Sequence, residues 1–369
     1  MPDERMLETP ILRQRAAAAL RTMFVADALA MPVHWYYRTA DILKQFPGGV
    51  TQLEAAPSFH PSSIMALHST RKGGRGSHGS GSEREIVGDV ILKGKRQFWG
   101  IDNQHYHQGM QAGENTLNAH CARVLLRVLG VNQGHYDQQQ FLNDYVAFMT
   151  AHQPHHPDTY AESYHRGFFA NLENGAALNK CGAVTHDTPS IGGLVSIAPI
   201  VLAERLRGTL LHEVKQICRQ HLWLTHPDKA LATICDHYVE LLDSLLFRTH
   251  EQSVQDVLAA CAKKSIGLNL PELTRKYSSD QQVVGGVFSI ACYIDGAWPS
   301  VLYLAYRYAN DMQAGLLANT NLGGDNVHRG IVLGALLGLA SATTLEHFYL
   351  KLTDHAQIEV EISAVCMGA

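Results

Sequence analysis

Apolar residues recur at helical spacing along most of the chain. From Leu117 to Val128 they follow an i, i+4, i+7, i+8, i+11 pattern, which is typical of one buried helix face. The same periodicity predicts further helices over about residues 11–31, 138–152, 159–175, 191–207, 209–222, 228–248, 252–263, 283–296, 298–317 and 326–343. No convincing run of alternating strand residues is present. We therefore predict an all-α fold, a compact multi-helix bundle in which residues 1–369 form a single domain.

The last of these helices carries a stripe of glycines. Gly330, Gly334 and Gly338 recur every four residues, and small residues at this spacing let a second helix approach closely. Before them lies Gly323-Gly324-Asp325, a turn whose glycines can adopt conformations closed to residues with a Cβ. The apolar run Gly330–Ala342 is shorter than the roughly 18–20 residues needed to cross a bilayer. We expect it to be a core helix.

Residues 68–84 contain too few apolar side chains to pack, which predicts a flexible loop. Within this segment, Gly74 to Gly79 formally matches the dinucleotide-binding pattern G-x-G-x-x-G. No hydrophobic strand precedes the match and no convincing helix follows it, so we interpret it as accidental. A solvated loop is the first interpretation, and a lid that contacts phosphate is the second.

Composition and charge exclude some partners. The 30 basic and 34 acidic residues give a formal charge of -4, which offers no electrostatic case for nucleic acid or a membrane as principal partner. The seven cysteines form no C-x-x-C pair and are expected to be reduced thiols. The charged N-terminus lacks the organisation of a secretory signal, so we expect a cytoplasmic location. The 21 histidines offer candidates for metal binding or proton exchange.

Four polar turns stand before apolar helices or at their ends, and they suggest where chemistry is carried out. Asp325 falls where helix N-caps and metal-binding carboxylates both occur, so either role is open to it. His34 is followed by aromatic residues that suit either core packing or stacking on an adenine. The four turns are Ala26–Trp35, Gly113–Thr116, Ser190–Gly193 and Gly323–His328.

The order and character of these turns resemble the ADP-ribosylglycohydrolase superfamily. Members carry an early G-D-A-L-G-x-P-V-E-like segment, then T-D-D-T, and a late G-G-D-T-D-T before a glycine-rich helix. Here Asp27–Val33, Glu114–Thr116 and Gly323–His328 occupy those places, and Thr225-His226-Pro227 resembles a central T-H-P segment. The resemblance spans about residues 18–343. The phrase His105–Asn118 is similar to a divergent branch that includes the J1-crystallin-like proteins.

In that family, the second and last motifs supply oxygens to two magnesium-type ions that hold the ribose diol. Oxygen ligands suit such hard cations. Only Thr116 and Asp325 are unaltered here, while Asn115 has lost a charge, Val327 offers no ligand and His328 brings an imidazole. These changes argue against an ordinary dinuclear magnesium site. They leave one divalent ion (Mg, Mn or Zn) or none, and the candidate ligands are Glu114, Thr116, Asp325 and His328.

The resemblance implies a hydrolase that cleaves an N- or O-glycosidic bond at the ribose anomeric carbon of an ADP-ribose-type ligand or ADP-ribosylated substrate. The expected catalytic residues are Glu114, Asp325 and His328, which must then surround one cavity. Expected to bind substrate are Asp27, His34, Asn115, Ser190, Gly192, Gly323, Gly324 and Asn326. The alternative is a catalytically inactive homologue that binds ADP-ribose or has a structural, crystallin-like role. The sequence leaves the oligomeric state open.

Overall fold

Helices account for the regular structure of the chain. The computed structural model describes residues 9–71 and 84–367. Across these residues no strand forms, and β pairing is limited to isolated bridges. The predicted all-α single-domain fold is confirmed. The α-helices are α1 (Thr9–Ala30), α2 (Thr39–Gln45), α3 (Leu117–Val131), α4 (Gln138–Met149), α5 (Ser163–Glu173), α6 (Ile197–Leu206), α7 (Leu211–Trp223), α8 (Lys229–Leu246), α9 (Val254–Ile266), α10 (Leu270–Lys276), α11 (Asp280–Val283), α12 (Ile294–Arg307), α13 (Met312–Leu322), α14 (Asn326–Ser341), α15 (Glu346–Tyr349) and α16 (His355–Cys366).

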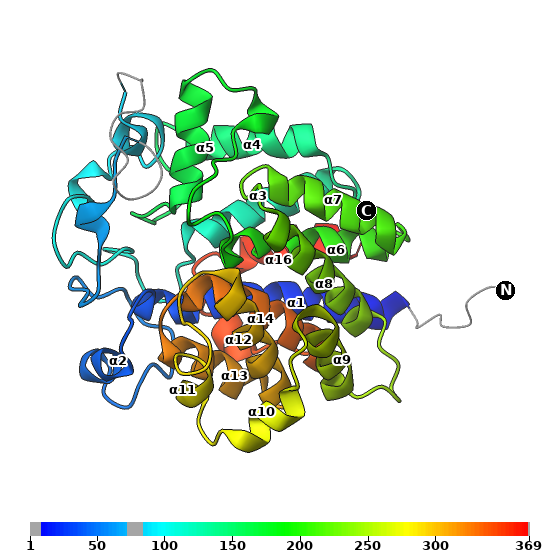
Figure 1. The fold of residues 1–369 in the computed structure, drawn as a ribbon. Coiled ribbons are helices and arrows are strands. Elements are labelled where there is room, and N and C mark those ends of the chain that lie inside the picture. The colour runs from blue at the N-terminus through cyan, green and yellow to red at the C-terminus, as the bar shows by residue number, and fades with distance from the viewer. Residues whose placement is uncertain (1–8, 72–83, 368–369) are drawn as a thin grey trace.

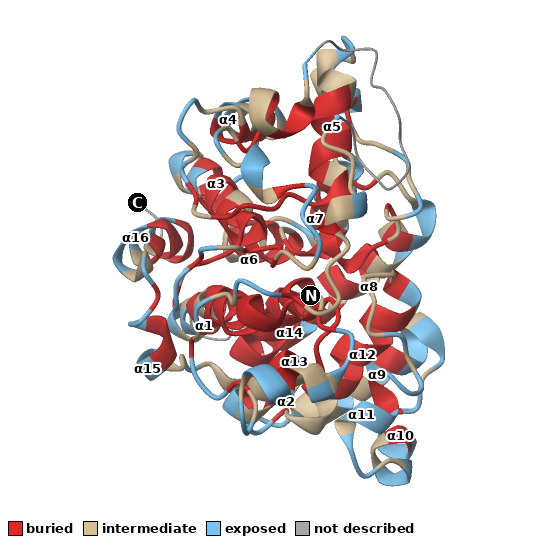
Figure 2. Cartoon of the chain, turned by 90° about the vertical axis from the view of Figure 1, so that its left-hand side faces the viewer, coloured by how far each residue is buried: buried red, intermediate tan, exposed pale blue. Residues whose placement is uncertain are grey.

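Two helices from opposite ends of the sequence form the centre of the molecule. Figure 1 shows α1 crossing the middle of the fold beside α14. The glycine stripe of α14 makes this approach possible, because a Cβ on Gly338 would lie 2.5 Å from Cα of Ala19 and one on Gly334 would lie 2.8 Å from the carbonyl oxygen of Thr22. Both helices are buried along nearly their whole length, whereas peripheral helices such as α2 and α10 expose one side (Figure 2).

The segment Thr9–Val33 is apolar and long enough to cross a membrane by composition alone. In the fold, 94% of its most apolar window is buried inside the protein. α1 therefore buries its apolar surface by packing against α14 and its neighbours, as expected of a central core helix.

Most predicted helices match an observed helix to within a few residues, but the prediction over 283–296 is wrong. α11 ends at Val283, and α12 begins only at Ile294. Gly285 has a φ of +106°, which does not fit a right-handed helix, and a Cβ on Gly286 would lie 2.3 Å from the carbonyl oxygen of Gln282. The intervening loop packs against the turn at Gly323-Gly324 instead.

Three other predicted helices need changed boundaries. The helix predicted over 298–317 spans two observed helices, because α12 ends at Arg307 and α13 begins at Met312. The helix predicted over 159–175 begins at Ser163, which leaves Asp158 to Glu162 outside α5. The helix predicted over 191–207 is divided into a 3-10 turn, η6 (Ile191–Leu194), and α6. Short or amphipathic helices with weaker periodicity were not anticipated, namely α2, α10, α15 and α16. Of the predicted flexible loop at 68–84, residues 72–83 lie outside the described residues.

Candidate functional site

The turn before α14 places the first two functional side chains. Gly323 and Gly324 have φ values of +69° and +65°, and a Cβ on them would lie 2.2 Å from the Tyr36 carbonyl oxygen and 2.1 Å from that of Ile290. Only glycine fits both the conformation and the space. The turn is therefore sandwiched between two chain segments, and it delivers Asp325 and His328 to the buried N-terminus of α14.

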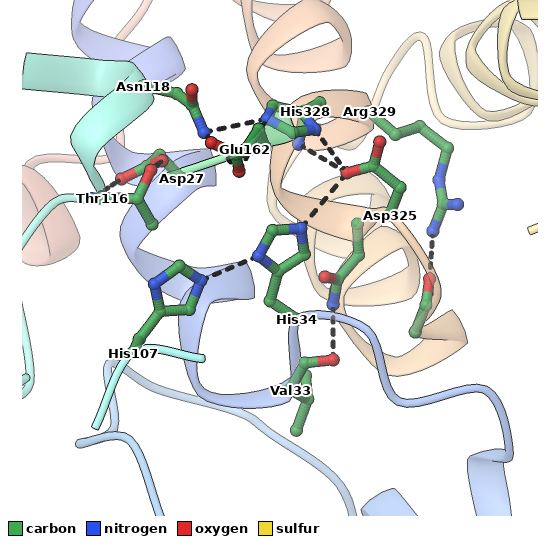
Figure 3. A network of polar contacts seen from close by, with 12 residues as sticks. Asp27, Val33, His34, His107, Thr116, Asn118, Glu162, Asp325, His328 and Arg329 are labelled. Carbon is green, nitrogen blue, oxygen red and sulfur yellow. Dashed lines mark hydrogen bonds and ion pairs between the residues drawn. The ribbon is translucent and has the colours of Figure 1, made fainter. Parts of the chain in front are cut away.

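Six acidic and imidazole side chains follow one another in a connected row, and we call them the imidazole–carboxylate chain; Figure 3 labels five of them, all except Asp158. Asp158 Oδ1 lies 2.8 Å from His107 Nδ1, and His107 Nε2 lies 2.8 Å from His34 Nδ1. His34 Nε2 is 3.2 Å from Asp325 Oδ1, which is 2.7 Å from His328 Nδ1. His328 Nε2 then faces Glu162 Oε1 at 3.4 Å. The members, all buried, are Asp158, His107, His34, Asp325, His328 and Glu162.

The charges within this chain stabilise one another. Burial alone would lower the pKa of His328, but Asp325 and Glu162 raise it to about 10. Burial would raise the pKa values of Asp325 and Glu162, yet the adjacent His328 holds both well below their usual range. The same opposition raises the pKa of His107 beside Asp158. His34 differs, because burial lowers its pKa to about 4 and keeps it neutral.

The Glu162 end of the imidazole–carboxylate chain lines a cavity of about 180 Å³. Glu162 and His328 line it together with Asp187, Ser190 and Arg166. Glu162 Oε2 and the Nε of Arg166 have no hydrogen-bond partner among the described residues. Aromatic rings make up much of the remaining wall: Trp35, Tyr37, Tyr106, Tyr160, Tyr164 and Tyr293. The cavity therefore offers an acid, a guanidinium and flat apolar surfaces to a ligand.

Trp35 is held in a strained conformation at this cavity. Its φ is +66°, a region that a bulky residue rarely adopts, and its backbone N–H donates to the carbonyl of Gly324. Its ring stacks on His34 with the centroids 4.8 Å apart. Strain of this kind gathers at functional sites, where the surrounding structure enforces it.

Glu114 lies away from Asp325 and His328. It lines a separate cavity of about 290 Å³ with His120, His156 and Asp354, and its carboxylate accepts from the backbone N–H of Gln111. The three side chains expected to surround one cavity therefore do not: His328 and Glu114 line different cavities, and Asp325 lines neither of them. The turn at 113–116 directs Glu114 outward because its other polar side chains face inward.

Those inward side chains are occupied by Asp27. Asn115 Nδ2 donates to Asp27 Oδ2 at 2.8 Å, as does the backbone N–H of Thr116, and the Thr116 hydroxyl donates to Oδ1 at 2.6 Å. All three side chains are buried, and burial raises the pKa of Asp27. The contacts join the end of α1 to the start of α3.

The remaining expected residues are spread around the site. His34 lies beside Asp325, and Ser190 lines the same cavity as His328. Gly192 lines a small neighbouring cavity with Asn118 and His226. Gly323 and Gly324 shape the turn by their backbone. Asn326 is buried, and its side-chain amide donates to the carbonyl of Thr320.

Sequence reasoning missed the two acids that complete the imidazole–carboxylate chain, Asp158 and Glu162, and the cavity's Arg166. These residues belong to no motif, and the first two lie just before a helix, where a cap is the ordinary expectation. His107 was recognisable only as half of a His-x-His pair with His105. His105 instead donates to the carbonyl of Pro32.

A model of the family described as ADP-ribosylglycohydrolase matches residues 8–345. The chain belongs to the ADP-ribosylglycohydrolase family. Among solved structures, it is similar to a protein titled "ADP-ribosylglycohydrolase-related protein complex", with 16% sequence identity, a TM-score of 0.58, and coverage of 97% of this chain and 99% of that one. That likeness shows a shared fold. No curated protein matches the chain. Family membership supports a glycohydrolase-like function.

The residues of this family member do not fit the two-ion oxygen site that the resemblance implies. Glu114 lies in another cavity, and Asn115 and Thr116 are bound to Asp27. Val327 is fully buried and has no ligand atom. A different set does converge: ligand atoms of His34, Asp325 and His328 all lie within 4.8 Å of one another.

Proposed function

We propose that this family member is a hydrolase that cleaves an N- or O-glycosidic bond at the anomeric carbon of an ADP-ribose-type substrate. The observation that carries the proposal is the position of Glu162. It lines the aromatic cavity, its Oε2 lacks a partner among the described residues, and His328 holds its other oxygen. An ionised carboxylate held in this way can serve as one of the two carboxyl groups that glycoside hydrolases commonly use.

The other cavity-lining groups support the substrate class. Arg166 is fully buried, and its hydrogen bonds go to the backbone of Ser69 and the ring of His68. No carboxylate in the described part of the chain pairs with it within 4 Å. An anionic ligand group such as a diphosphate would supply that charge. The aromatic rings suit a nucleobase, which presents a flat face for stacking.

In the mechanism that we propose, Glu162 takes the part first expected of Glu114. Its pKa lies well below the usual range because His328 is adjacent, so it is ionised at neutral pH. Its free oxygen can orient a water molecule toward the anomeric carbon and stabilise the positive charge that develops on the ribose ring. His328 and Asp325 are positioning residues: they fix the direction of Glu162 and keep it charged.

We also propose that the site binds one divalent ion (Mg, Mn or Zn). The candidate ligands are His34, Asp325 and His328.

We further propose that the protein works in a reducing, cytoplasmic setting. None of the seven cysteines, all within the described residues, forms a disulfide. Burial raises the pKa of several of them, as in Cys261, where it reaches about 12, so these thiols are unreactive.

The test is release of ADP-ribose from ADP-ribosylated arginine, ADP-ribosylated serine and small O-glycosides. We expect Glu162→Gln to lower the rate by about 100-fold or more, because the amide removes the charge and the proton acceptor. Glu114→Gln, in the other cavity, is expected to retain the wild-type rate within about twofold, as ordinary surface changes do. Equal inertness of wild type and both variants on every substrate would exclude hydrolysis. A thermal shift with ADP-ribose would then separate a binding protein from a structural one.

A further inference from the structure

The centre of the imidazole–carboxylate chain has the composition of a site for a borderline metal. His34 Nε2 comes from the turn that follows α1, Asp325 Oδ1 and His328 Nδ1 come from the start of α14, and all three residues are at most 2% exposed. We infer that these three side chains bind a single zinc-class ion, in place of the two oxygen-bound ions of the family pattern. Two imidazoles and one carboxylate suit zinc, whereas magnesium prefers an octahedral shell of oxygens.

Unpartnered atoms in the cluster point to a missing ligand. Asp325 Oδ2 and His328 Nδ1 have no hydrogen-bond partner in the described part of the chain, although both are fully buried. His328 Nδ1 lies 2.7 Å from Asp325 Oδ1, but the contact lacks the in-line geometry of a hydrogen bond. Buried polar atoms are ordinarily satisfied, so two such atoms on neighbouring residues of the cluster indicate a position for a cation.

The distances need only a small adjustment. Ligands of a tetrahedral zinc ion at about 2.1 Å lie about 3.4 Å from one another. His34 Nε2 is already 3.2 Å from Asp325 Oδ1, and the 2.7 Å contact to His328 has to widen by roughly half an ångström or more. The third atom pair lies within 4.8 Å.

Each imidazole has a partner on its second ring nitrogen, as metal-ligating histidines commonly do: His328 faces the carboxylate of Glu162, and His34 reaches that of Asp158 through His107. With the ion bound, His34 donates its Nδ1–H to His107 Nε2, and His107 donates its Nδ1–H to Asp158. His328 would bind the ion through Nδ1, with release of the Nδ1 proton to solvent, and its Nε2 faces Glu162 Oε1 at 3.4 Å. The Asn118 amide, 2.8 Å from that Nε2, donates to the same carboxylate at 2.9 Å. Glu162 Oε2 remains for the substrate side.

The surrounding charge also favours a divalent ion. The imidazole–carboxylate chain contains three buried carboxylates, those of Asp158, Asp325 and Glu162. Arg329 is the nearby guanidinium, but it donates to Asn319 and the Gly323 carbonyl rather than to Asp325. A divalent ion at the centre of this row of side chains would offset the negative charge of these carboxylates.

Metal binding tests the inference without any turnover, so its failure is distinct from failure of the proposed hydrolase. Protein stripped with a chelator is titrated with Zn²⁺ and, separately, with Mg²⁺. We expect one Zn²⁺ per chain and far weaker Mg²⁺ binding. His34→Gln should weaken Zn²⁺ binding by more than about 100-fold, and His107→Gln by about 10- to 100-fold. His120→Gln, a buried histidine outside the chain, is the matched control.

If His34→Gln misfolds, the absorption spectrum of a Co²⁺ complex provides a second test of whether residue 34 binds the ion. His34→Cys keeps a ligand at this position, and its Co²⁺ complex should show a thiolate-to-cobalt absorption band that the wild-type complex lacks. Circular dichroism verifies folding of each variant. The inference is overturned if stripped wild type takes up no Zn²⁺, if folded His34→Gln binds it as tightly as wild type, or if folded His34→Cys shows no such band.

Discussion

At the residue scale, the decisive feature is which side chains each buried acid contacts. Asp27 shows that a motif position can have a role other than contact with a ligand. Its carboxylate accepts from Asn115 and Thr116 through three hydrogen bonds of 2.6–2.8 Å. These contacts fix the turn before α3, and with it the start of the helix that carries Asn118. The side chain therefore acts through the geometry of its neighbours.

Replacing this carboxylate should destabilise the fold. Asp27→Asn places an amide N–H₂ among three donors, and we expect a loss of unfolding free energy on the order of 2 kcal/mol or more. Urea denaturation measures the change. Asp144→Asn, exposed on α4, is the control and should change stability by less than about 0.5 kcal/mol. An Asp27→Asn protein as stable as wild type would show that these hydrogen bonds contribute nothing net.

At the element scale, the close contact between α1 and α14 sets the position of the site. One 3-10 turn (Met31–Val33) separates the end of α1 from His34, and α14 begins directly after Asp325, so a change in the separation of the two helices moves these side chains relative to each other. The glycines of α14 allow the two backbones to approach beyond what a Cβ permits. This packing supplies the rigidity that a site built from distant segments requires.

A methyl group at Gly338 is expected to disturb that contact. Its Cβ would meet the α1 backbone at Ala18 and Ala19, at 2.7 and 2.5 Å, so Gly338→Ala should destabilise the protein by about 2 kcal/mol or more. Gly130→Ala on α3 is the comparison, because its Cβ would meet only the methyl of Ala364, at 3.0 Å. There the helix propensity gain of about 1 kcal/mol offsets the crowding. Equal effects of both variants on the melting temperature would contradict the close-packing interpretation.

At the scale of the whole molecule, buried neutral histidines dominate the response to pH. Burial lowers the pKa of His165 to about 4, and the pKa values of His120, His221 and His226 to about 3. In the unfolded chain each would titrate near 6.5. The unfolded state therefore binds more protons below that pH. The stability associated with these histidines is complete above pH 6.5 and is lost as the pH falls.

We accordingly expect acid unfolding at mild pH. Each of these histidines removes about 1.4 kcal/mol per pH unit below 6.5, so the four together remove about 8 kcal/mol by pH 5, comparable to the whole stability of many domains. Unfolding free energies at pH 7.5, 6 and 5 measure the slope. His221→Gln should reduce it by about one proton, whereas exposed His250→Gln should leave it unchanged. A flat profile between pH 7.5 and 5 would be inconsistent with neutral buried rings.

The amino-acid sequence by itself determined the fold class, the family, most helix positions and the special turn before α14. These features depend on hydrophobic periodicity and glycine placement within short segments, so they can be predicted without knowledge of distant contacts. The sequence-based prediction failed over 283–296, where Gly285 and Gly286 form a turn after α11 despite the apolar pattern. It also assigned Glu114 to the site, because a motif records which residue types are present and not the direction in which a turn presents them.

Only the tertiary structure decided which side chains meet. Packing of α1 on α14 brings His34 to Asp325, and the placement of α5 brings Glu162 to His328. No local pattern encodes such encounters, since they depend on the summed packing of helices that are distant in the sequence. The Asp27 contacts turn Asn115 and Thr116 inward and leave Glu114 in another cavity. The burial that perturbs the charges of the site likewise exists only in the folded chain.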